Sequence, residues 1–132
     1  LAAVGRGVLT GGLEQLRITR PDLLEFVPRV GEVVLGDGCA GDHDLVEPID
    51  AAAMILAYQS AYRVTREKDY LVKMRRAFGW FLGENDMGMS LYDHETKGCA
   101  DGLLPEGVSL NQGGESTVSF LMALLAMIEE MK

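Results

Sequence analysis

A long polar connection between two apolar helical patterns constrains the fold of this chain most. It runs from Asp86 to Thr117 and is rich in Gly, Asp, Asn and Gln. Compact domains seldom keep so long a connection unless it binds a ligand or packs as a structured unit. We therefore interpret residues 86–113 as a functional loop at one end of a helical scaffold.

Three segments have the apolar spacing of helices: about Val46–Val64, Glu67–Gly83 and Gly114–Glu130. Pro48 suits a first helical turn, and Asp44 is a candidate N-cap before it. Because only a few residues separate the first two segments, they are predicted to form an antiparallel αα-hairpin. The patterns together predict an all-α fold of antiparallel αα-hairpins.

The predicted helices differ in how much of their surface is apolar. Ala51–Ala57 is apolar on every side, which predicts a helix buried all round. The last segment also has apolar residues around most of its circumference, so it is predicted to be a second inner helix, whereas Glu67–Gly83 is amphipathic and predicted to be outer. The predicted core-facing stripe of the last segment consists of Phe120, Leu121, Leu124, Leu125 and Ile128.

Other parts of the chain give weaker signals. Val8–Ile18 and Asp22–Leu35 have moderately helical patterns. Within the loop, Met89–Asp93 and Gly98–Asp101 are predicted to pair as a small β-hairpin that turns over residues 94–97.

Composition limits the function classes. The 132 residues suit a single helical domain, 48% hydrophobic and 24% charged, as is ordinary for globular proteins. A net charge of -8 argues against a nucleic-acid partner. The longest apolar run, Val118–Ile128, is too short to span a bilayer, and the chain opens with no secretory leader, so no membrane partner is expected. Cys39 and Cys99 do not form a disulfide framework, which favours the cytoplasm.

Carboxylates in and beside the loop form the first candidate site. Glycosyl hydrolysis or transfer needs one carboxylic acid to protonate the leaving oxygen and one carboxylate as base or nucleophile. We select Asp101 and Glu115 as this catalytic pair. The alternative is structural, since Asp-Gly at Asp101 is typical of a turn and Glu115 favours a helix N-terminus. The carboxylates considered are Asp86, Asp93, Asp101, Glu106 and Glu115.

A second group could bind a sugar directly. Aromatic faces pack on sugar rings, and amide side chains both donate and accept hydrogen bonds. The predicted substrate-binding residues are Tyr92, Asp93, Asn111 and Gln112.

 The alternatives are that Tyr92 packs on the loop hairpin, that Asp93 serves the turn, and that Asn111 caps the following helix.

Metal and cofactor signals are weak. Cys39, His43, His94 and Cys99 have the spacings C-x3-H and H-x4-C, and two cysteines with two histidines are a legitimate tetrahedral zinc set. Neither spacing is the common zinc knuckle, and no neighbour marks either thiol as an activated nucleophile. The glycines form no nucleotide-binding fingerprint. We therefore expect no metal and no cofactor.

Six short motifs occur in a fixed order along the chain: Pro48–Met54, Ala61–Thr65, Phe78–Asp86, Leu91–Asp93, Gly98–Leu103 and Asn111–Thr117. In this order they resemble the C-terminal part of bacterial α/α-toroid proteins of the six-hairpin glycosidase-like type, which are often fused to or found beside glycosyltransferases. The resemblance covers about Glu47 to Leu125. One departure is Leu45-Val46-Glu47-Pro48, where the family usually carries Gln-Gln-Pro.

The resemblance implies a partial α/α toroid, in which αα-hairpins form part of a ring and the loops at its mouth face a sugar. It also implies a carbohydrate-binding or carbohydrate-processing domain linked to a glycosyltransferase system. A full toroid needs more helices than this chain supplies. The expected partners are therefore a sugar or glycan ligand together with missing parts of a larger chain or a homo-oligomer partner. The alternative is a non-catalytic helical interaction or assembly module, because an incomplete ring exposes apolar helix faces.

Overall fold

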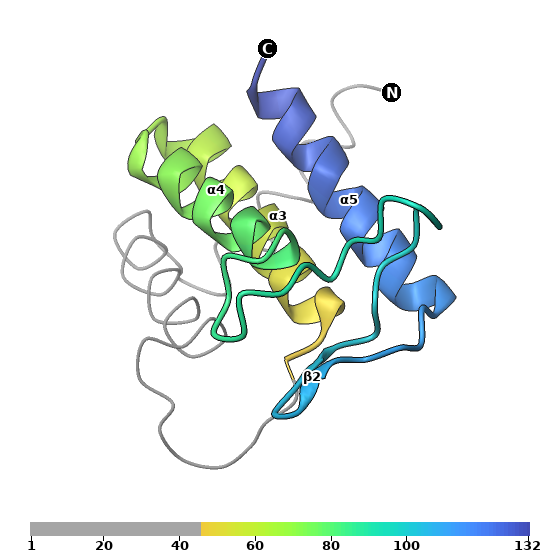
Figure 1. Cartoon of the computed structure of the whole chain (residues 1–132). Coiled ribbons are helices and arrows are strands. Elements are labelled where there is room, and N and C mark those ends of the chain that lie inside the picture. Colours follow the sequence, from red (N-terminus) through yellow and green to blue (C-terminus); the bar gives the residue numbers. More distant parts are fainter. Residues whose placement is uncertain (1–45) are drawn as a thin grey trace, which may run out of the picture.

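A computed structural model of the chain describes residues 46–132, which are mostly helical (Figure 1). The helices are α3 (Pro48–Thr65), α4 (Asp69–Phe81) and α5 (Gly114–Glu130). A small antiparallel sheet of two strands lies between α4 and α5 in the sequence. The three predicted helices are confirmed, and the helical patterns at Val8–Ile18 and Asp22–Leu35 lie outside the described residues.

The start of α3 follows from its sequence, with one correction. Its N-cap is Glu47, not the expected Asp44, which lies outside the described residues. The Glu47 backbone is extended and its N–H donates to Asp50 Oδ2 at 3.2 Å. Pro48 then occupies the first turn, where its missing N–H costs nothing. Capping and proline therefore set the same boundary.

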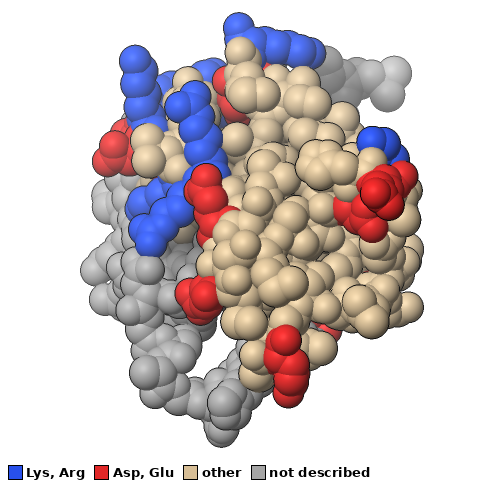
Figure 2. All heavy atoms as spheres, in the orientation of Figure 1, with Lys and Arg blue, Asp and Glu red and all other residues tan. Residues whose placement is uncertain are grey.

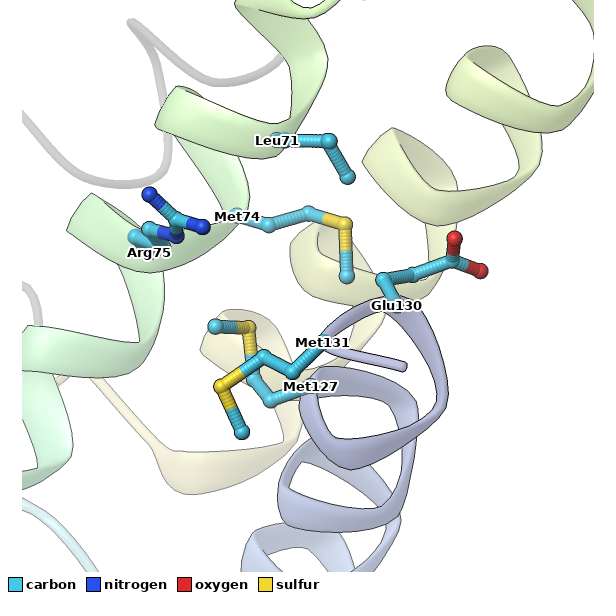
Figure 3. A pocket seen from close by; sticks show the side chains of 6 residues that line it. All are labelled: Leu71, Met74, Arg75, Met127, Glu130 and Met131. Atoms are coloured by element: carbon cyan, nitrogen blue, oxygen red, sulfur yellow. The ribbon is translucent and has the colours of Figure 1, made fainter.

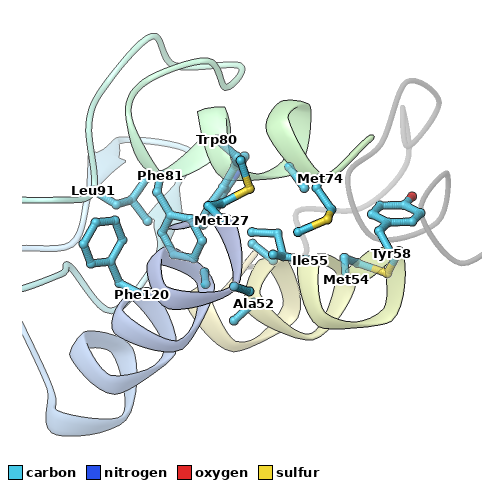
Figure 4. Packing of buried hydrophobic residues seen from close by; sticks show 14 of the residues in the cluster. Ala52, Met54, Ile55, Tyr58, Met74, Trp80, Phe81, Leu91, Phe120 and Met127 are labelled. Atoms are coloured by element: carbon cyan, nitrogen blue, oxygen red, sulfur yellow. The ribbon is translucent and has the colours of Figure 1, made fainter. Parts of the chain in front are cut away.

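The three helices pack side by side around one core. Arg66 ends α3 in the left-handed conformation, with φ of 64°, and the chain turns back into α4 as the predicted αα-hairpin. Helix α5 lies against α3 and α4 (Figure 1). The core between the helices is aromatic and aliphatic (Figure 4). Its largest fully buried side chains are Phe81, Ile55, Met74, Leu91, Pro48 and Cys99.

Two predictions about helix burial are wrong. On α3, Ala53 and Ala57 are exposed, so the Ala51–Ala57 stretch is buried on one side only. On α5, the predicted stripe faces outward except for buried Phe120 and half-buried Leu124. Most buried side chains of α5 are small and allow the helix to approach the core closely, while Phe120 and Met127 are its large buried side chains. The buried residues of α5 are Ser116, Ser119, Phe120, Ala123, Ala126 and Met127.

The loop hairpin is shorter than predicted. Tyr92 and Cys99 form a single antiparallel bridge, and the Ala100 N–H donates to Leu91 O at 2.9 Å. The turn over residues 94–97 is confirmed by the Lys97 N–H, which donates to Asp93 O at 2.9 Å. Hydrogen bonds within the turn therefore stabilise residues 91–100 without two long paired strands.

A second hairpin was not predicted. Strand β1 (Leu103–Leu104) pairs with β2 (Gly107–Val108), and Leu103 also bridges to Val46 ahead of α3. Strands of two residues are too short to show an alternating pattern. Gly107 has φ of 138°, a conformation that L side chains rarely adopt, so a glycine is required at this turn.

Within residues 46–132, no helix combines the length and the apolarity needed to cross a membrane.

Candidate functional site

A pocket of about 290 Å³ lies where the N-terminal ends of α3 and α5 come together. Three carboxylate side chains belong to its wall, from Glu47, Asp101 and Glu115. Residues of the first turns of both helices line it as well, so the acidic residues lie near two helix N-termini. The lining residues are Glu47, Pro48, Ile49, Asp101, Gly113, Gly114, Glu115 and Ser116.

Asp101 organises the start of α5. Its Oδ1 accepts hydrogen bonds from the Gly113 N–H at 2.6 Å and the Ser116 hydroxyl at 2.8 Å, while Asn111 Nδ2 donates to Oδ2. The Gly113 N–H, then Ser116 and Asn111, lower the pKa of Asp101. The carboxylate therefore stays ionised at neutral pH, which suits an acceptor or base and not a general acid.

A side chain at position 113 would displace this carboxylate. A Cβ at position 113 would lie 2.8 Å from Asp101 Oδ1, closer than real Cβ contacts. Gly113, and not Asn111, is the N-cap of α5. The alternative that Asn111 caps the helix is therefore wrong. Asn111 instead holds Asp101 from the other side, and the Asp101 N–H donates to Asn111 O at 2.9 Å.

The predicted catalytic residues Asp101 and Glu115 line the same pocket. Glu115 stands in the first turn of α5 and is exposed to solvent. Glu47 also lines the pocket, although the sequence does not mark it as a site residue. The one signal for it is its position directly before Pro48, which places it at the N-terminal end of a helix.

A separate cluster forms around Asp93 and Gln112. Gln112 Nε2 donates to Asp93 Oδ2 at 3.1 Å, and the Thr96 hydroxyl donates to Gln112 Oε1 at 2.7 Å. The Glu95 N–H donates to Asp93 Oδ1 at 2.8 Å, and this bond, followed by the one from Gln112, lowers the pKa of Asp93. The turn interpretation of Asp93 is confirmed.

Tyr92 joins the loop to the helical core. Its ring stacks on Phe120 with a centroid distance of 4.6 Å and an interplanar angle of 15°. The edge contact with His94 has a centroid distance of 4.8 Å. One face of the Tyr92 ring is therefore occupied by Phe120 of α5, whereas the packing alternative expected the loop hairpin there. The pocket wall does not include Tyr92, Asp93, Asn111 or Gln112.

Two of the four residues considered as zinc ligands, His94 and Cys99, lie in the described part of the chain. Cys99 is fully buried, whereas His94 is exposed. Burial, and then the charge of Asp101, raise the pKa of Cys99 to about 11, so the thiol is protonated at neutral pH. Cys39 and His43 lie outside the described residues. Across residues 46–132, no three His, Cys, Asp or Glu side chains are grouped to hold a metal ion.

A second, much smaller pocket lies between α4 and the C-terminal end of α5 (Figure 3). Its volume of about 10 Å³ is no larger than a water molecule requires. The wall is formed mainly by methionine and leucine side chains, and the space is too small for a ligand. The lining residues are Leu71, Met74, Arg75, Met127, Glu130 and Met131.

Comparisons of the chain with protein-family models, curated proteins and solved structures gave no match. The function of the pocket must therefore be argued from its own residues.

Proposed function

We propose that this chain is a carbohydrate-binding or carbohydrate-processing helical domain linked to a glycosyltransferase system, and that it binds sugar in the pocket between α3 and α5. The observation that carries the proposal is the convergence of Glu47, Asp101 and Glu115 on one pocket. Carboxylate oxygens accept hydrogen bonds from sugar hydroxyls. The volume of about 290 Å³ lies near the small end of ligand pockets and suits a single sugar unit.

The charge of the pocket restricts the ligand. Three carboxylates repel uronic or sialic acids, whereas the hydroxyl groups of neutral sugars and the ammonium group of amino sugars can donate hydrogen bonds to them. The ligand class that the pocket favours is therefore a neutral hexose or an amino sugar.

Binding has more support than catalysis. Both oxygens of Asp101 already accept hydrogen bonds, from Gly113, Ser116 and Asn111. If the domain processes glycosides, the lowered pKa of Asp101 assigns it the role of base or nucleophile, and Glu115 is then the acid. Such a pair requires a carboxyl separation of about 5–5.5 Å for retention or about 6.5–9.5 Å for inversion.

The four other predicted site residues act indirectly in this proposal. Asn111 positions Asp101, and Tyr92, Asp93 and Gln112 hold the loop against α5. The ring architecture, the cytoplasmic location and the link to a glycosyltransferase come from the sequence: the cysteine usage supports the location, and the six motifs support the other two.

Titration calorimetry of the full chain with a panel of sugars tests the proposal. We expect heats of binding with neutral or amino sugars and none with uronic acids. Glu115→Gln should weaken binding about tenfold, because it replaces an ionic acceptor in the pocket. Glu106→Gln is the matched control, since Glu106 is exposed on the β1–β2 turn and does not line the pocket. Absence of binding to every sugar, or equal affinities of the two variants, would reject the proposal.

One observation favours the second candidate, a non-catalytic assembly module. Large apolar side chains of α5 are exposed along the helix, including Val118, Leu121 and Leu125. An assembly module would need such a surface, whereas sugar binding in the pocket would not.

A further inference from the structure

Helix α5 has an apolar face that the described part of the chain leaves exposed. We define the outer face of α5 as Val118, Leu121, Met122, Leu125 and Ile128. Each of these side chains is between 40% and 56% exposed. A continuous row of large apolar side chains on one helix is typical of an interaction surface.

The spacing on this face is that of a coiled-coil seam. Val118, Leu121, Leu125 and Ile128 follow one another at intervals of three, four and three residues, as a and d positions do in a heptad. The opposite side of α5 packs on its own core through Ser119, Ala123 and related small residues. The helix is therefore two-sided, and its outer side has the pattern that fits another helix.

We propose that the outer face of α5 pairs with the same face of a second copy of this chain, with the two α5 helices antiparallel about a two-fold axis. A self-complementary face of this kind is what an isologous dimer requires. Basic side chains gather instead over α4, and largely uncharged surface covers much of the rest of the face in Figure 2.

Charge complementarity selects the antiparallel orientation. When two copies are centred on Ala123, Val118 lies opposite Ile128 of the other copy and Leu121 opposite Leu125. The same register brings Glu115 next to the last residue, Lys132, of the other copy. A parallel pair would instead place Glu115 beside Glu115 and would align the two helix dipoles unfavourably. Lys132 also interacts electrostatically with Glu129 of its own chain.

Sedimentation equilibrium of the full chain tests the surface. We expect a dimer whose dissociation constant rises about 100-fold or more in Leu125→Glu, because a carboxylate would be buried in the seam. Val72→Glu is the matched control, since Val72 is an equally exposed apolar residue on α4, and it should leave the dimer intact. Circular dichroism checks that both variants fold. A monomeric wild-type chain, or a dimer that survives Leu125→Glu, would overturn the proposal.

Charge exchange tests the orientation. Glu115→Lys and Lys132→Glu should each weaken the dimer about two- to fivefold at low salt, and the double exchange should restore it. No restoration in the double variant would overturn the antiparallel register. Binding of a monomeric wild-type chain to phosphatidylcholine vesicles would identify a lipid surface as the occupant and would also overturn the proposal. The dimer is measured without sugar, so its failure leaves the pocket proposal standing.

Discussion

The two ends of the α3–α5 pair are joined by different chemistry. At the N-terminal ends, the Asp101 carboxylate accepts hydrogen bonds from neutral donors on the loop and on α5. At the C-terminal ends, Arg63 of α3 forms ion pairs with Glu129 at 2.7 Å and Glu130 at 2.9 Å. Buried Gln59 adds hydrogen bonds to both glutamates. The N-terminal ends of the two helices border the pocket, whereas the C-terminal ends are joined only by contacts between the two helices.

The difference between the two ends shows which contacts order the loop. The bonds of Asp101 connect residues up to fifteen positions apart in the sequence, so they order the loop as well as the helix start. Arg63 and its partners are already in regular helices and gain little further order. We therefore expect the loop end to respond strongly to mutation and the ion-paired end to respond weakly.

The largest expected effect belongs to Phe120, which joins the loop to the core. Its ring contacts Tyr92 and lies 5.7 Å from Phe78 and 5.4 Å from Phe81 between centroids. Phe120→Ala should lower the free energy of unfolding by about 3–5 kcal/mol, because it removes a buried aromatic ring and leaves a cavity. Urea denaturation measures this loss. Val72→Ala, at an exposed site of α4, should change it by less than about 0.5 kcal/mol, and equal losses in the two variants would contradict the comparison.

The next effect is that of Asp101. Asp101→Ala leaves the Gly113 N–H and the Ser116 hydroxyl without their acceptor, so the melting temperature should fall by several degrees. Asp101→Asn keeps one oxygen that can accept these bonds, and its loss should be smaller. Thermal unfolding followed by circular dichroism separates the two variants. Equal melting temperatures for Asp101→Ala and the wild type would show that the loop is ordered by other contacts.

Much of the helical structure could be predicted from the sequence. The bounds of α5 match the prediction because Gly113-Gly114 precedes one long apolar run. Its buried face could not be predicted, since a helix that is apolar on most sides has no single favoured face. Packing against α3 and α4 decides which face is buried: Ser119 and Ala123 are buried, whereas Leu121 and Leu125 are exposed.

The candidate site could be predicted only in part. Asp101 and Glu115 were selected by residue type, and they share a pocket. The role of Asp101 in holding α5 depends on contacts with Asn111 and Gly113, which residue types alone do not specify. The β1–β2 hairpin could not be predicted, because strands of two residues are too short to show an alternation of apolar and polar residues.

Acid should act on the loop end through its carboxylates. The folded-state pKa values of Asp101 and Asp93 lie below the ordinary value of 3.8. Between those lowered values and pH 3.8, the folded chain therefore binds fewer protons than the unfolded chain. Their stabilisation is fully present above pH 3.8 and is lost as the pH falls through the lowered pKa values. Urea midpoints measured from pH 5 to pH 2 should fall less steeply in Asp101→Asn than in the wild type. Identical slopes would exclude Asp101 as a source of the acid sensitivity.

The smallest effect is expected at the ion-paired end. Arg63 is exposed, and exposed ion pairs contribute little because water and salt screen them. Arg63→Ala should therefore lower the melting temperature only slightly at low salt, and the difference from the wild type should vanish in about 1 M NaCl. The loss in Asp101→Ala should persist in the same salt, because the hydrogen-bond donors to Asp101 are all neutral. Lys68→Ala, at the exposed N-cap of α4, is the control for a general change of net charge. Salt screens interactions between charges more than hydrogen bonds from neutral donors. If 1 M NaCl removed the loss of melting temperature in Asp101→Ala but not in Arg63→Ala, the proposed difference between the two ends would be wrong.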